Sequence, residues 1–167
     1  MRTDAPRGPE VWIRGPVAAA PAPRPAPASP STVRRFSWVG THGGSGASTL
    51  AAVYGGQDCG RDWPGPADPP SVLLVARTHA TGLARVVHAL KVFRRGQVPA
   101  GLDLDAVVLV ADAPGRLPRP LAQQVRRIES VIDVYRVPWV PAWRLGELGG
   151  RPPRETQDLI RLTSTVR

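Results

Sequence analysis

The sequence predicts an α/β protein in which helices cover both faces of a parallel sheet. Three apolar runs of strand length, within 36–39, 72–76 and 106–111, are each followed by a turn and a helix-forming segment. Near-continuous apolar runs are typical of strands buried on both faces, as in parallel sheets. With a further run at 131–137, we expect a three-layer fold with about four or five parallel strands.

Length and composition exclude several classes of protein. The chain has 167 residues, which is enough for one domain with a single core. Its one cysteine, Cys59, excludes an intrachain disulfide and a cysteine-rich metal site. No apolar run approaches the ~20 residues needed to cross a bilayer, and the first residues lack the apolar core of a signal peptide. We therefore expect a cytoplasmic protein without a membrane span.

The N-terminal segment differs from the rest. Residues 1–35 hold eight of the 20 prolines and predict a disordered tail, and 36–167 predict the folded domain. Six arginines and two carboxylates give the tail +4 of the net charge of +9. The tail is interpreted either as a solvated linker or as an arm that binds nucleic acid or docks on a partner through its Val-Trp-Ile segment at 11–13.

The most specific stretch is the glycine-rich turn after the first apolar run. Its glycines permit positive φ and close approach of the backbone to a ligand: Gly40, Gly43, Gly44 and Gly46. Residues 47–54 predict a helix that ends at Gly55-Gly56. A strand, a glycine turn and a helix N-terminus bring backbone N–H groups together and favour an anion. This stretch therefore predicts a phosphate-binding turn.

Residues 42–49, His-Gly-Gly-Ser-Gly-Ala-Ser-Thr, resemble the deviant Walker A motif of the ParA/MinD family of P-loop ATPases, K-G-G-x-G-K-[ST]-T. His42 and Ala47 stand where that family has its signature lysine and its phosphate-binding lysine. The resemblance implies a trimmed P-loop NTPase-like domain whose nucleotide site includes Gly43, Gly44, Ser45, Gly46, Ala47, Ser48 and Thr49. The layout of 36–163 also resembles an uncharacterised family of short P-loop-like proteins from high-GC Gram-positive bacteria, often found near plasmid and mobile-element genes.

The missing lysines weaken the expected chemistry. In an active P-loop, lysine contacts the β- and γ-phosphates and offsets charge in the transition state. One such charge-assisted hydrogen bond contributes roughly 1.5–3 kcal/mol, and Ala47 supplies none of it. The backbone turn remains, so we expect weak binding of ATP or ADP with Mg²⁺ and no fast hydrolysis. No residue is assigned a catalytic role.

Polar residues at the ends of the next two strands could join this site. Arg77 and His79 follow the run at 72–76, and ligands of open α/β sheets bind at the carboxyl ends of the strands. Each could contact a phosphate or be purely structural. Asp112 opens Asp-Ala-Pro-Gly, which resembles the Walker B segment of ParA/MinD proteins, and the resemblance implies Mg²⁺ held by Ser48 and Asp112. The alternatives for Asp112 are a turn-capping role, or a place on a later strand without a metal.

The remaining elements follow from periodicity. A helical stripe predicts a helix that Gly96 ends, with these residues facing the core: Leu83, Val86, Val87, Leu90 and Phe93. Residues 118–129 predict a second helix, 131–137 a strand, 155–162 a terminal helix and 55–71 a loop. His88 lies off the stripe and is expected to be exposed.

Three functions compete. Our hypothesis is a degenerate P-loop protein that binds nucleotide or phosphate weakly and acts as a scaffold or positioning factor for an unnamed protein partner. The alternative is an active ATPase of the ParA/MinD type in plasmid or mobile-element maintenance, with Arg77 or a partner's residue replacing the lost lysine. A serine hydrolase is the remote alternative, since Ser45 fits a loose G-x-S-x-[GA] elbow, but no histidine follows His88. The sequence specifies no oligomeric state.

Overall fold

The computed structural model describes residues 34–164. The predicted tail therefore lies outside the described residues, except for Arg34 and Arg35 at its end. Arg34 belongs to the folded domain, which corrects the predicted boundary after residue 35. Its guanidinium pairs with the buried carboxylate of Asp105 and donates a hydrogen bond to the carbonyl oxygen of Leu162, 3.0 Å away.

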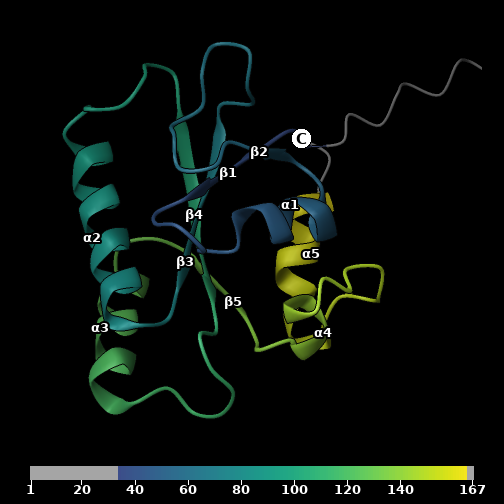
Figure 1. Cartoon of the computed structure of the whole chain (residues 1–167). Coiled ribbons are helices and arrows are strands. Elements are labelled where there is room, and N and C mark those ends of the chain that lie inside the picture. Colours follow the sequence, from purple (N-terminus) through teal and green to yellow (C-terminus); the bar gives the residue numbers. More distant parts are fainter. Residues whose placement is uncertain (1–33, 165–167) are drawn as a thin grey trace, which may run out of the picture. The chain divides into compact units, whose positions relative to one another are not determined.

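Five parallel strands form one sheet in the order β2-β1-β3-β4-β5 (Figure 1). Along the chain the elements are β1 (Ser37–Gly40), α1 (Ala47–Tyr54), β2 (Gln57–Asp58), β3 (Ser71–Arg77), α2 (Ala80–Arg94), β4 (Asp103–Val110), α3 (Arg119–Glu129), β5 (Val134–Val137), α4 (Pro141–Arg144), the 3₁₀ turn η1 (Arg154–Thr156) and α5 (Gln157–Ser164). The predicted α/β class and the parallel sheet are confirmed.

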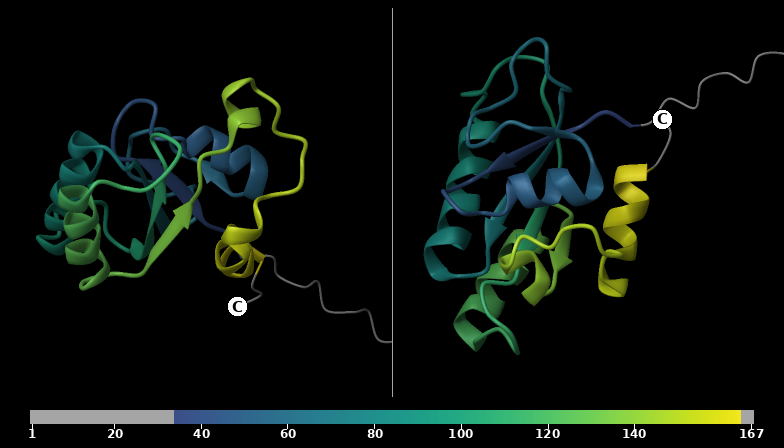
Figure 2. Two further views of the ribbon diagram at one scale, coloured as in Figure 1. Left: turned by 90° about the horizontal axis from the view of Figure 1, so that it is seen from below. Right: turned by 45° about the vertical axis from the view of Figure 1, so that its right-hand side comes forward.

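The direction of each crossover decides which face a helix covers. From β1 the chain crosses through α1 to β2 on one side, whereas α2 and α3 lead to β4 and β5 on the other. Parallel crossovers are right-handed in nearly all proteins, so α1 must cover the face opposite to α2 and α3. The structure has this arrangement, and α5 lies on the same face as α1 (Figures 1 and 2).

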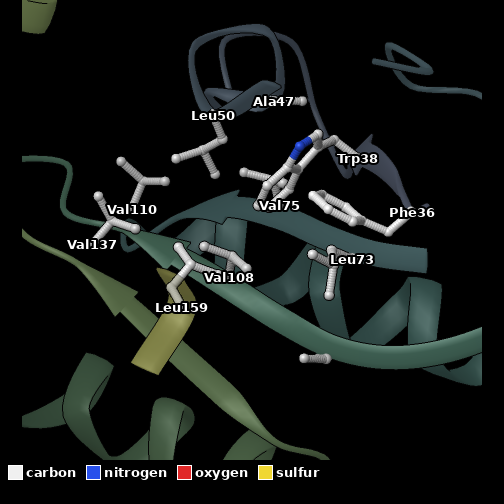
Figure 3. Close-up of a cluster of buried hydrophobic side chains, with 11 residues drawn as sticks. Phe36, Trp38, Ala47, Leu50, Leu73, Val75, Val108, Val110, Val137 and Leu159 are labelled. Atoms are coloured by element: carbon white, nitrogen blue, oxygen red, sulfur yellow. The ribbon is translucent and has the colours of Figure 1, made fainter. Parts of the chain in front are cut away.

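Alternating strand residues build a core on each face of the sheet. Phe36 and Trp38 face α1, and their rings meet edge to face with centroids 5.3 Å apart (Figure 3). Val39, which points the other way, belongs to the cluster under α2 and α3. The indole N–H of Trp38 donates to the carbonyl oxygen of Gly55, 2.6 Å away. This satisfies the polar atom of a fully buried ring.

Two boundaries and the exposure of one side chain differ from the sequence-based expectation. The predicted loop at 55–71 contains the short edge strand β2, because the amide of Gln57 bonds the carbonyl of Phe36 and continues the sheet. The fourth predicted strand starts at Val134 and not at Val131. The amides of Val131 and Ile132 both bond the carbonyl of Ile128, so these residues complete the end of α3.

Val87 is the third difference. Leu83, Val86 and Leu90 are buried against the sheet as predicted, but Val87 is 38% exposed. It lies one residue further around the helix than Val86, on the outward side of α2. No helix within the described part of the chain is long and apolar enough to cross a membrane.

Candidate phosphate site

The glycine turn lies where the sheet changes its winding direction. β1 and β3 are neighbours, and the helices that follow them cover opposite faces. The connections that follow their carboxyl ends therefore leave toward opposite faces, and open α/β sheets bind ligands in the crevice at such a switch point. The strand order 2-1-3-4-5 is that of flavodoxin-type doubly wound sheets, with this crevice between the first and third strands.

The turn presents backbone donors at the start of α1. Gly46 precedes the helix with φ 103°, a conformation that a residue with a Cβ adopts only under strain. No side chain caps α1. Its first amides have no partner within the helix either, since the intrahelical bonds begin with Leu50 N–H to the Gly46 carbonyl, 2.9 Å away. These amides form an anion-binding geometry at the mouth of the crevice.

The side chains of the turn point in different directions. Ser45 is buried, with its Oγ against the Cα of Gly40. Ala47 is buried in the core cluster under α1 (Figure 3). Ser48 is exposed, and Thr49 lines a small cavity of about 30 Å³ beside the turn. Gly43 and Gly44 are exposed.

Arg77 connects the glycine turn to the neighbouring strand end. Its Nε donates to the carbonyl oxygen of Gly44 at 3.2 Å, and one terminal nitrogen donates to the carbonyl oxygen of Ala111 at 3.1 Å. Burial, and then the nearby Arg144 guanidinium, lower the pKa of Arg77 from its ordinary value, and the carboxylate of Asp112 opposes this. Two guanidinium groups thus share a site in which a bound anion would reduce their repulsion.

A larger cavity shares two lining residues with the small one. The 30 Å³ cavity is lined by Gly46, Thr49, Arg77, Trp139 and Arg144, among others. It shares Ala111 and Pro138 with a cavity of about 450 Å³ at the ends of β4 and β5. The larger cavity has the volume of a small-molecule site.

Two histidines near the turn accept hydrogen bonds from backbone amides. His42 accepts a hydrogen bond at Nε2 from the amide of Arg77, 3.1 Å away. His79 is the N-cap of α2 and accepts at Nδ1 from the amide of Gly82, 2.9 Å away. Their ring centroids lie 5.0 Å apart. His79 also lines the cavity of about 450 Å³, so its contact with a ligand stays a prediction.

Asp112 lies at the end of a strand that does not neighbour β1. β3 separates β1 from β4, and Arg77 spans the interval. Asp112 is exposed, and its amide bonds the hydroxyl of Thr78. Within 34–164 no three His, Cys, Asp or Glu side chains cluster in a way that could hold a metal ion. The metal role of Ser48 and Asp112 stays a prediction.

The sequence favours packing over base stacking for Trp139 and Trp143, and it does not place Arg144 in the site. Arg144 and Trp139 reach it because β5 ends at the same edge of the sheet as β1 and β3. The Arg144 guanidinium lies over the Trp139 ring, 4.4 Å from its centroid. Arg77 was singled out because ligands of open α/β sheets bind at the carboxyl ends of the strands. The same reasoning, applied to the end of β5, would have singled out Trp139 and Arg144.

Comparison with known proteins gives one match. Residues 35–163 match the model of a family of unknown function (DUF6668). The chain belongs to this family. No curated protein and no solved structure matches the chain. The matched range begins with the residues that enter β1 and ends inside α5, so the family comprises the whole sheet and both helical layers.

Proposed function

We propose that the crevice between β1 and β3 binds the phosphate end of a nucleotide-like ligand weakly, in a protein that acts by partner binding. The observation that carries the proposal is the bridge of Arg77 between the Gly44 and Ala111 carbonyls, beside the uncapped start of α1. It places a fixed positive charge next to free backbone donors, which together make a phosphate site.

In this proposal the site is a degenerate P-loop. Arg77 supplies the charge that Ala47 lacks, and Arg144 adds a second cation from the far side of the crevice. The phosphates contact the amides of 43–48 other than that of Ser45, which donates to the His42 carbonyl, and the ring part of the ligand enters the 450 Å³ cavity. ATP and ADP are the ligands to test first, because the glycine pattern resembles that of a nucleotide-binding turn.

The chemistry of the site supports binding more than turnover. The side chain at position 47 faces the core, so no ammonium group reaches the β- and γ-phosphates there. Asp112 is separated from the turn by β3. The active-ATPase alternative therefore depends on Arg77 alone or on a residue from a partner. The serine hydrolase alternative requires an exposed nucleophile, and Ser45 is 4% exposed.

Calorimetric titration of the full chain with ATP, ADP and tripolyphosphate, each with and without Mg²⁺, tests the proposal. We expect weak binding of all three polyphosphates, with at least a tenfold loss in Arg77→Met, since a charge-assisted hydrogen bond is worth about 1.5–3 kcal/mol. Arg95→Met, which removes an exposed arginine outside the crevice, is the matched control. Absence of heat at millimolar ligand would overturn the proposal.

Gly46→Val provides a second variant for the same titration. Valine is strained at φ 103°, and its branched side chain would approach Val110, since even a Cβ at this position lies 3.6 Å from the Val110 Cγ2. We expect loss of polyphosphate binding together with reduced stability. Phosphate release measured on the unaltered chain then distinguishes a binding protein from an ATPase.

A further inference from the structure

The outward side of α2 and α3 carries a groove that the phosphate site does not use. The two helices lie side by side on one face of the sheet, opposite α1 and α5 (Figures 1 and 2). The groove between them has a volume of about 460 Å³. Its lining residues are Leu83, Ala84, Val87, Leu90, Lys91 and Arg94 from α2, and Gln124, Arg127, Ile128 and Val131 from α3 and its end.

The floor and walls of the groove are apolar. Leu83, Leu90 and Ile128 are buried and form its floor. Val87 and Val131 are 38% and 46% exposed and stand on either side. On each side the lining residues recur at intervals of three or four, over about three turns on α2 and about two turns on α3 and its end. This concave shape and length fit the apolar stripe of a helix laid into the groove.

The rim of the groove is positively charged. Lys91, Arg94 and Arg127 line it, and no carboxylate does. None of the three pairs with a carboxylate of residues 34–164, whose ion pairs lie elsewhere. The two helices together hold six cations and one carboxylate, Glu129, which is itself paired with Arg136 at 2.6 Å.

One buried polar atom in the groove lacks a partner. The Oε1 atom of Gln124 is buried without a hydrogen bond, and it is the only such side-chain atom among the described residues. Buried polar atoms are paired in nearly all native proteins. An N–H or O–H group of a docked chain would supply the missing donor.

We propose that this groove binds an amphipathic helix of a partner protein whose apolar stripe is flanked by Asp or Glu. Acidic flanks pair with the three free cations, and the stripe covers Val87 and Val131. A second copy of this chain would place like charges opposite each other. Nucleic acid would use the cations but gain nothing from the apolar floor. The inference rests on the partner-binding part of the proposed function and is independent of the phosphate site.

A displayed library of 15-residue helical peptides tests the proposal on the full chain. The library keeps an apolar stripe at i, i+4 and i+7 and varies the flanking positions among Asp, Glu, Lys, Arg, Ser and Asn. We expect enrichment of acidic flanks, and at least a tenfold loss of affinity, measured by fluorescence anisotropy, in the double variant Val87→Glu, Val131→Glu. Both valines are exposed, so the variant should keep its fold, which its circular dichroism checks.

Charge reversal gives the sharper readout. The triple variant Lys91→Glu, Arg94→Glu, Arg127→Glu should select basic flanks from the same library. A triple reversal at the exposed Arg35, Arg151 and Arg154 changes the net charge equally and should leave the acidic preference intact. No enrichment, enrichment without a charge preference, or affinity unchanged by the groove variants would overturn the proposal. The same variants are tested with a 20-base-pair DNA. If no peptide is enriched and only the triple variant in the groove loses DNA binding, the face binds nucleic acid and the proposal is overturned.

The experiments distinguish failure of the phosphate-site proposal from failure of the groove proposal. The groove variants lie on helices α2 and α3 and should leave the calorimetric titration with polyphosphate unchanged. Arg77→Met should in turn leave peptide binding unchanged, because Arg77 does not line the groove.

Discussion

His42 accepts a hydrogen bond at Nε2 from the backbone amide of Arg77, and this bond joins the glycine turn to the end of β3. Because Nε2 accepts, Nδ1 carries the proton and donates to the carbonyl of Gly43, 2.8 Å away. His42, which stands where the ParA/MinD motif that this turn resembles has a lysine, is therefore part of the framework that positions Arg77. A lysine has no acceptor with which to do the same.

His42→Lys should for this reason reduce stability although it restores the lysine of the motif. We expect a loss of about 1–2 kcal/mol in the free energy of unfolding, because the partly buried Arg77 amide is left unpaired. Urea denaturation measures it. His42→Gln, which offers an amide oxygen as acceptor, is the control and should lose less. Equal stability of the lysine variant and the unaltered chain would show that the bond contributes nothing.

Gly82→Ala should disturb the site through the backbone. A Cβ at residue 82 would lie 2.2 Å from the carbonyl oxygen of Arg77 and 3.1 Å from His42 Nε2. The start of α2 must move away, at a cost of about 1–3 kcal/mol. We expect lower thermal stability and weaker polyphosphate binding together. Thr81→Ala, at the exposed neighbouring position, should change neither, and a fully stable Gly82→Ala variant would contradict the packing described.

Ala47→Lys tests whether the turn can be converted to an active P-loop. The side chain at position 47 is 5% exposed and packs in the core cluster under α1 (Figure 3). A lysine there overpacks the core and buries part of its stem, so we expect a loss of about 1–3 kcal/mol and no gain in phosphate release from ATP. Ser48→Lys, at an exposed position, should stay within about 0.5 kcal/mol of the unaltered chain. A gain in turnover by Ala47→Lys would favour the ATPase alternative.

The raised pKa of Tyr54 predicts that the protein becomes less stable at alkaline pH. Burial raises the pKa of Tyr54 above its ordinary value, and the hydrogen bond to the Thr156 hydroxyl at 2.8 Å opposes this only in part. The neutral phenol is thus favoured in the folded protein. The contribution of the neutral phenol to the free energy of unfolding is complete below the pKa of about 10 that Tyr54 has in the unfolded chain. This contribution is lost as the pH rises through the pKa of Tyr54 in the folded protein.

Tyr54→Phe should therefore flatten the pH dependence of the unfolding free energy between about pH 9 and 11. At neutral pH the variant should be less stable by about 1 kcal/mol, because it lacks the hydrogen bond to Thr156. Urea denaturation at each pH measures both effects. Burial also raises the pKa of Cys59 and Tyr135, so part of the slope should remain. If the unfolding free energies of the variant and the unaltered chain changed with pH in parallel, Tyr54 would be excluded as a source of the pH dependence.

Ser45→Ala separates the hydrolase alternative from the binding proposals. The buried Ser45 hydroxyl packs against Gly40, so substrate access requires the turn to open. We expect no esterase turnover with p-nitrophenyl acetate above the blank, in either the unaltered chain or the variant. Turnover that the variant abolishes would establish the hydrolase.

Apolar runs and glycines were enough to predict the parallel sheet, the helices and the position of the glycine turn. Each of these depends on local periodicity, which the order of residues carries directly. Helix ends were less predictable, because the hydrogen bonds at Val131 and Ile132 decide them. The exposure of Val87 depends on how α2 is rotated about its own axis when it packs on the sheet. A helical stripe in the sequence predicts this rotation only to within about one residue.

The sequence by itself determined the α/β class, the anion-favouring turn and the absence of a lysine at position 47. Only the tertiary structure decided that Arg77 bridges the turn and β4, that Arg144 joins it from β5, and that α2 and α3 leave a basic groove. The physical reason is that these contacts join residues 30 to 100 positions apart in the chain, which only the order of strands in the sheet brings together.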